Sequence, residues 1–150
     1  MVTGIVAALL HVDMVVQDVQ RAIAIYTDLF GFEVVEDCVV ETDAALFLSG
    51  GATRRMRLVF LRLNARSSMV ELIQLLDGAG NGLPASTEGK FEWNLTLLVN
   101  NLQHAKEKLA AAGLRQVSDE YDVALPKLGK SRVLYCRDAD GYLIELVAPA

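Results

Sequence analysis

The sequence predicts an α+β protein built from two copies of one β-α-β-β-β module. The first observation is a repeat: HVDMVVQDVQRAIAIYTDLFGF at residues 11–32 returns as NLTLLVNNLQHAKEKLAAAGL at residues 94–114. The second is a late strand after each copy with one glutamate among apolar residues, MVELIQL at 69–75 and YLIELVAP at 142–149. Internal similarity of this kind reflects a duplicated structural unit, so it decides the architecture before any single motif.

The length of 150 residues fits two small, tightly joined modules in one compact domain. Residues 77–90 are rich in glycine and small polar residues and read as a linker. We therefore expect the first module over residues 1–76 and the second over residues 91–150.

Composition and charge exclude several classes of function. The apolar fraction is 53% against 22% charged residues, which supplies a core and argues against disorder. A net charge of −5 argues against a nucleic-acid partner, because a phosphate-binding face needs a basic patch. The first apolar run, residues 5–10, is too short for a membrane span or a signal peptide. Cys38 and Cys136 are too few for a disulfide framework, so we expect reduced thiols and a cytoplasmic protein.

The first copy should contain a strand at residues 9–16, a helix and three further strands. Asp18 can cap the helix by accepting hydrogen bonds from its first turn, and Gly31 can end it in a left-handed conformation. Apolar residues between them recur at spacings of three and four, which predicts one buried stripe. The later strands are expected at residues 32–40, 56–63 and 69–76.

Residues 42–51 look like an insertion into the shared module. Sixty positions separate His11 from Glu71, whereas 51 separate Asn94 from Glu145, so the first copy carries about nine extra residues. This segment fits a short helix, capped by Thr42 or Asp43 and ended by Gly50, and it also fits a strand. Inserted segments often contact ligand.

The second copy should contain strands at residues 91–99, 114–118, 132–137 and 142–147 and a helix at 101–112. DADG at 138–141 predicts a tight turn between the last two strands. Residues 119–130 are expected to form a long loop that could act as a lid.

The alternation of strand residues groups polar side chains on one face of each copy. The face in the first strand carries His11, Asp13 and Val15, and the matching face in the repeat carries Asn94, Thr96 and Leu98. Glu71 and Glu145 each lie midway along an apolar strand. A half-buried carboxylate is unfavourable without a cation, proton or donor. Two such carboxylates and an imidazole suggest a metal site; the alternative is that both glutamates face solvent.

The chain resembles the vicinal-oxygen-chelate superfamily, which includes glyoxalase I, methylmalonyl-CoA epimerase, extradiol dioxygenases and the bleomycin- and fosfomycin-resistance proteins. The resemblance covers nearly the whole chain, and HVDMVVQDVQRAIAIYTDLFGF and RDADGYLIELVAP carry it, with Ala139 where proline is usual. It implies that the modules pair into curled mixed sheets around a cleft. The family's metal ligands fall by position on His11, Glu71, Asn94 and Glu145.

Asn94 departs from the family pattern, which commonly has histidine there. By resemblance, His11, Glu71 and Glu145 could still hold a divalent metal such as Zn, Ni, Co, Mn or Mg. Two carboxylates argue against the iron site of oxygen-activating members, so an isomerase or lyase fits better than a dioxygenase.

The isomerase branch implies proton transfer next to a metal-chelated carbonyl of a small substrate. Glu145 is the expected catalytic proton carrier, with Glu71 as the second candidate. Four further residues are substrate-binding candidates: Asn94, Arg54, Arg55 and Arg132. The alternative is a metal-free ligand-binding protein of the drug-sequestering type, a possibility that Asn94 favours. The resemblance also implies a homodimer.

Overall fold

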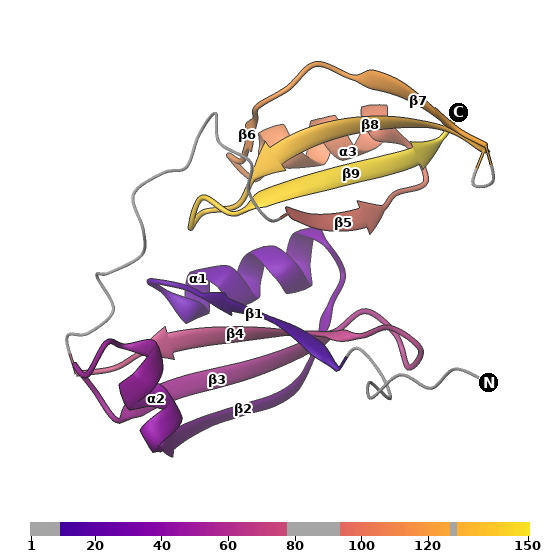
Figure 1. Ribbon diagram of the computed structural model, residues 1–150. Helices are drawn as coiled ribbons and strands as arrows, with labels where there is room; N and C mark the ends of the chain where they lie inside the picture. Colours follow the sequence, from indigo (N-terminus) through magenta and orange to yellow (C-terminus); the bar gives the residue numbers. More distant parts are fainter. Residues whose placement is uncertain (1–9, 78–93, 127–128) are drawn as a thin grey trace, which may run out of the picture. The chain divides into compact units, whose positions relative to one another are not determined.

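The computed structural model describes residues 10–77, 94–126 and 129–150 (Figure 1). The chain divides into two units, Met1–Leu83 and Pro84–Ala150, each with its own mixed sheet. The predicted linker at residues 77–90 lies outside the described residues except for its first position, so the proposed module boundaries stay predictions. None of the helices in the described parts of the chain is long and apolar enough to cross a membrane.

The first unit follows the predicted order of elements. In the four-stranded sheet the order is β1-β4-β3-β2, with β1 parallel to β4 and the other neighbours antiparallel. Its elements are β1 (His11–Val15), α1 (Val19–Ala24), η1 (Ile25–Leu29), β2 (Glu33–Glu41), α2 (Asp43–Leu48), β3 (Arg55–Arg62) and β4 (Met69–Leu75).

The first helix begins and ends where the sequence predicts, but its second half is not a regular α-helix. Asp18 Oδ1 accepts a hydrogen bond from the Arg21 amide at 3.0 Å, which caps the first turn. After α1 the backbone continues as the π-helical turn η1, and Gly31 follows at φ 75°, where a side chain would be strained.

Helices cover both faces of the first sheet. One face packs against α1, and its core includes Val59, Leu61, Leu72 and the helical Val19, Ala22 and Tyr26. The inserted segment at residues 42–51 forms α2, which settles its two predicted alternatives in favour of a helix. Ala45 of α2 packs with Met56, Ile73 and Leu75 on the face opposite α1. That second face also carries the polar residues discussed below.

The second unit repeats the arrangement around the sheet order β5-β9-β8-β6, with β5 parallel to β9 and β7 also paired to β8. The buried side chains Ile144, Leu146 and Leu134 contribute to its core, and α3 packs on β8 and β9. Its elements are β5 (Asn94–Leu98), α3 (Leu102–Ala111), β6 (Arg115–Gln116), β7 (Tyr121–Leu125), β8 (Gly129–Arg137) and β9 (Leu143–Pro149).

The predicted loop at residues 119–130 is wrong, because it contains β7 and the start of β8. Both β6 and β7 pair antiparallel with β8, so together they occupy the edge that β2 occupies in the first unit. Ser118 lies in the interruption, and its hydroxyl accepts a hydrogen bond from the Tyr135 amide at 2.9 Å. The side chain thereby takes the place of a ladder bond where the edge strand breaks. A paired edge strand does not fit the predicted lid.

Candidate metal centre

Strand register brings three ionisable side chains together on one face of the first sheet. His11 and Asp13 are two residues apart on β1, so they point to the same side. Asp13 lies directly opposite Glu71 of β4 in the parallel pair. The face is the one opposite α1, as the alternation of residues predicts.

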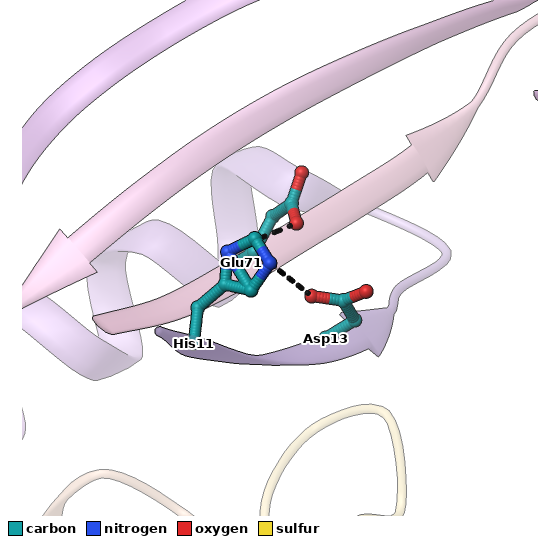
Figure 2. A group of neighbouring side chains, drawn as sticks. All are labelled: His11, Asp13 and Glu71. Carbon is teal, nitrogen blue, oxygen red and sulfur yellow. Dashed lines mark ion pairs between the residues drawn. The ribbon is translucent and has the colours of Figure 1, made fainter. Parts of the chain in front are cut away.

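The imidazole of His11 lies between the two carboxylates (Figure 2). His11 Nδ1 is 3.5 Å from Glu71 Oε2, and His11 Nε2 is 3.5 Å from Asp13 Oδ1. One potential ligand atom from each of the three residues lies within 4.8 Å of the others. Side-chain exposure increases from 8% for Glu71 through 27% for His11 to 52% for Asp13. The cluster is therefore closed at Glu71 and open to solvent at Asp13.

The described surroundings of His11 and Glu71 are largely apolar, apart from the members of the cluster themselves. Phe60 lies opposite Glu71 in the β3–β4 pair and stacks on the imidazole, with ring centroids 5.6 Å apart. His11 Nδ1 is buried, and no hydrogen bond to it is seen within residues 10–77, 94–126 and 129–150. Burial and the neighbouring Asp13 carboxyl raise the pKa of Glu71 to about 7. A buried nitrogen and two adjacent acids require a proton or a cation to compensate them.

A divalent cation fits these residues. Imidazole nitrogen and carboxylate oxygen are ligands that zinc and manganese accept, and two carboxylates balance the charge of a dication. An ion bound at about 2.0–2.2 Å separates its ligands by at most about 4.4 Å, so a small side-chain rotation would complete the set. Sequence reasoning placed Asp13 on this face but did not select it. The missing information was its cross-strand position opposite Glu71.

In the second unit, Glu145 occupies the position equivalent to Glu71 but has different neighbours. Thr96 lies opposite Glu145 in the parallel β5–β9 pair, and its hydroxyl donates to Glu145 Oε2 at 2.9 Å. Tyr135 lies opposite on β8 and donates to Glu145 Oε1 at 3.1 Å. Asn94 Oδ1 is 3.5 Å from the Thr96 hydroxyl, at the limit of a hydrogen bond. Each carboxylate oxygen of Glu145 thus has a hydroxyl donor.

The three arginines predicted to bind substrate are paired with acids of their own unit. Arg54 pairs with Asp43, and Arg55 pairs with Asp77 at 2.9 Å. Arg132 donates to Asp122 at 3.0 Å and lies 3.6 Å from Glu120. An anionic ligand would have to compete with these carboxylates, and the substrate-binding role of the arginines stays a prediction.

Comparison with known proteins identifies the family. The model of the Glyoxalase/Bleomycin resistance protein/Dioxygenase superfamily matches residues 8–146. The chain therefore belongs to this superfamily, which confirms the resemblance to the vicinal-oxygen-chelate proteins. No curated protein matches the sequence.

Solved structures support the fold. A glyoxalase family protein from Bacillus cereus is similar with a TM-score of 0.76 and 18% identity, covering 99% of this chain and 97% of that chain. Trypanothione-dependent glyoxalase I from Leishmania major is similar with a TM-score of 0.66 and 19% identity over 95% and 87%. A mutant of the fosfomycin resistance protein FosX from Listeria monocytogenes, solved with Mn(II) and 1S,2S-dihydroxypropylphosphonic acid, gives 0.64 and 15% over 97% and 93%. These likenesses confirm an α+β fold of two β-α-β-β-β modules.

Proposed function

We propose that this protein is a metal-dependent enzyme of the glyoxalase type, an isomerase or lyase that transfers a proton next to the carbonyl of a small substrate. The observation that carries the proposal is the His11–Asp13–Glu71 cluster, in which an imidazole with a buried nitrogen and two facing carboxyl groups offer ligand atoms within 4.8 Å of one another. Family membership supports it, because superfamily relatives include glyoxalase I and a FosX structure that contains Mn(II).

The residues of the cluster would hold the metal, and the metal would supply Lewis-acid polarisation of a substrate carbonyl oxygen. His11 would contribute one ring nitrogen, and its stacking on Phe60 restricts the orientation of the ring. Glu71 would contribute a carboxylate that is already desolvated, so little solvation is lost when the ion binds.

Proton transfer is assigned to Glu145, with Glu71 as the second candidate. A general base must be oriented as well as basic, and the hydroxyls of Thr96 and Tyr135 hold both oxygens of Glu145. In the proposed isomerisation of a carbonyl compound with a hydroxyl on the adjacent carbon, Glu145 removes the C–H proton of that carbon and returns it to the former carbonyl carbon. The hydroxyl proton of the first carbon passes to the former carbonyl oxygen, so the carbonyl and the hydroxyl change places. Tyr135 acts as a positioning residue, because its contact is with the base.

The test measures proton exchange and metal content in the same preparations. The full chain, loaded with Mn²⁺, is incubated in D₂O with small carbonyl compounds and their thiol adducts, and NMR follows the signal of the proton next to the carbonyl. We expect exchange that stops on chelation and is lost in Glu145→Gln. Metal-loaded protein that exchanges no proton in any of these compounds would contradict the proposal.

A metal-free binding protein of the drug-sequestering type is the second candidate, and Asn94 is the residue that favours it, because an amide is a poor ligand for zinc or nickel. Such a protein would bind an aromatic or cationic ligand equally well with and without chelator, and would show no turnover. Loss of binding on chelation would eliminate this candidate. The homodimer expected by resemblance stays a prediction, which light scattering of the purified chain would test.

A further inference from the structure

We propose that the first unit supplies three metal ligands by itself, with Asp13 in the place that the family pattern gives to a residue of the second unit. The inference rests on the metal dependence proposed above and changes the expected ligand set from His11, Glu71 and Glu145 to His11, Asp13 and Glu71. Three observations within the separate units support it.

The first observation is the position of Asp13. The parallel β1–β4 register sets its Cα directly opposite Glu71, and its Oδ1 lies 3.5 Å from His11 Nε2. Two ionised carboxylates directly opposite each other on a sheet repel each other, and a proton or a cation between them removes the repulsion. Only small motions of side chains are needed for His11, Asp13 and Glu71 to meet one ion, since their ligand atoms already lie within 4.8 Å of one another.

The second observation is the lack of conventional donors at Glu71. Its side chain is 8% exposed, yet among the described residues no amide or hydroxyl group donates a hydrogen bond to it. The polar atoms that approach it belong to His11 and Asp13. A carboxylate buried to this degree requires a partner, and a cation shared with Asp13 would be one.

The third observation is that Glu145 already has the partners that Glu71 lacks. Hydroxyl donors occupy both of its oxygens, at 2.9 Å from Thr96 and 3.1 Å from Tyr135. Its hydrogen bonds therefore compensate the carboxylate without a cation. Asn94, at the other family ligand position of this unit, offers only a neutral amide. In the second unit, the carboxylate of Glu145 is therefore hydrogen-bonded to two hydroxyls. The first unit contains the charged ligand atoms, those of His11, Asp13 and Glu71.

The ligand class follows from the donor set. One imidazole and two carboxylates suit a borderline or hard divalent cation such as Mn²⁺ or Zn²⁺, with open positions for water or substrate oxygen. The exposure of Asp13 leaves the cluster accessible from solvent on that side.

The test is a Mn²⁺ titration of the full chain, followed by the electron paramagnetic resonance signal of free Mn²⁺. We expect Asp13→Asn to bind at least about tenfold more weakly than wild type, the range that even indirect disturbance of a metal site produces. Glu145→Gln should bind as wild type does. Asp28→Asn, which removes an exposed acid from η1 of the same unit, is the matched control and should also bind as wild type does.

Thermal unfolding separates weak binding from misfolding. In chelator, Asp13→Asn should be at least as stable as wild type, because it removes a carboxylate next to Glu71; added Mn²⁺ should then stabilise wild type more than the variant. Wild-type affinity in Asp13→Asn, or an equal loss in Glu145→Gln, would overturn the inference and leave the proposed reaction standing. Asp13-dependent binding without proton exchange would instead overturn the reaction alone. A wild-type chain that binds no Mn²⁺ would overturn both.

Discussion

The repeat-related glutamates of the two units lie at equivalent strand positions but have opposite surroundings. Glu71 faces an aspartate across the parallel strand pair and a phenyl ring across the antiparallel pair. Glu145 faces a threonine and a tyrosine at the same two positions. At these two positions of the repeated module, the first unit thus has an acid and an apolar ring where the second unit has hydroxyl donors.

This difference shows that the position of a glutamate in the repeated module does not by itself decide how its carboxylate is compensated. The backbone register is shared, so the neighbouring side chains set whether the group is neutralised by a proton, held by hydrogen bonds or available to a cation. In the first unit burial, together with the Asp13 carboxyl, raises the pKa of Glu71 to about 7, whereas in the second unit two donors orient Glu145. Substitutions in each unit test this difference directly.

Removing the imidazole should have the largest effect. His11→Ala should weaken Mn²⁺ binding by more than about 100-fold, because it removes the nitrogen ligand itself and not merely its support. The measurement is the same titration of free Mn²⁺. His104→Ala is the control, since the other histidine lies in α3 of the second unit and should leave affinity unchanged. Equal affinity in both variants would contradict the assignment of His11.

The raised pKa of Glu71 predicts a pH dependence of stability in the metal-free protein. The folded state holds this proton up to about pH 7, whereas an unfolded glutamate releases it near its usual value of 4.5. The contribution is therefore complete below about pH 4.5 and is lost as the pH rises through 7, by at most about 3 kcal/mol. Urea unfolding in chelator at pH 5 and pH 8 should show wild type losing stability relative to Glu71→Gln. A stability difference between wild type and Glu71→Gln that does not change with pH, or that changes in the opposite direction, would contradict this prediction.

Removing one hydroxyl from the second unit should have a smaller effect. Tyr135→Phe leaves one oxygen of Glu145 without its donor. It should lower the free energy of unfolding by about 1.5 kcal/mol, the low end for hydrogen bonds to charged groups, because the contact is only partly buried. Urea unfolding measures this loss. Tyr121→Phe on β7 is the control, because Tyr121 is half exposed and no hydrogen bond from its hydroxyl is seen among the described residues. Equal losses in the two variants would show that the contact with Glu145 is not the cause.

Removing either of the two helix caps should have the smallest effect on stability, and the two losses should be similar. Asp18 accepts from the Arg21 amide at 3.0 Å, and Asn101 accepts from the His104 amide at 2.8 Å. Asp18→Ala and Asn101→Ala should each lower the free energy of unfolding by about 1 kcal/mol. Urea unfolding of both variants tests whether the caps are as equivalent as the repeat implies. A loss in one variant only would restrict the equivalence to the strands.

Much of the fold could be predicted because the repeat carries strong local signals. Asp18 and Asn101 mark the helix starts, glycines mark the ends, and the period of two places His11 and Asp13 on one face. The edge strand β7 could not be predicted in the same way. Its place depends on pairing with β8, and the residues at 119–120 and 126 on either side of it look like a loop.

The candidate site was predicted only in part, for a related reason. His11 and Glu71 stand out as a histidine and an acid in apolar strands. Asp13 becomes notable only when β1 and β4 are aligned in register across 58 positions of sequence, since Asp13 and Glu71 are then opposite each other. The hydroxyl donors to Glu145 are hidden likewise, because Tyr135 and Thr96 lie on different strands from their acceptor. The alternation of residues along a strand predicts which face of the sheet a side chain is on. Only the pairing of the strands shows which side chains lie next to it.

The most direct test of the central claim, that the first unit provides the charged ligands, is a crystal structure of the full chain grown with Mn²⁺. The anomalous difference map should place one ion at roughly 2.0–2.3 Å from a ring nitrogen of His11 and from carboxylate oxygens of both Asp13 and Glu71. In that structure Glu145 should keep its hydrogen bonds to Thr96 and Tyr135. An ion bound through Glu145, with Asp13 outside its coordination shell, would contradict the account.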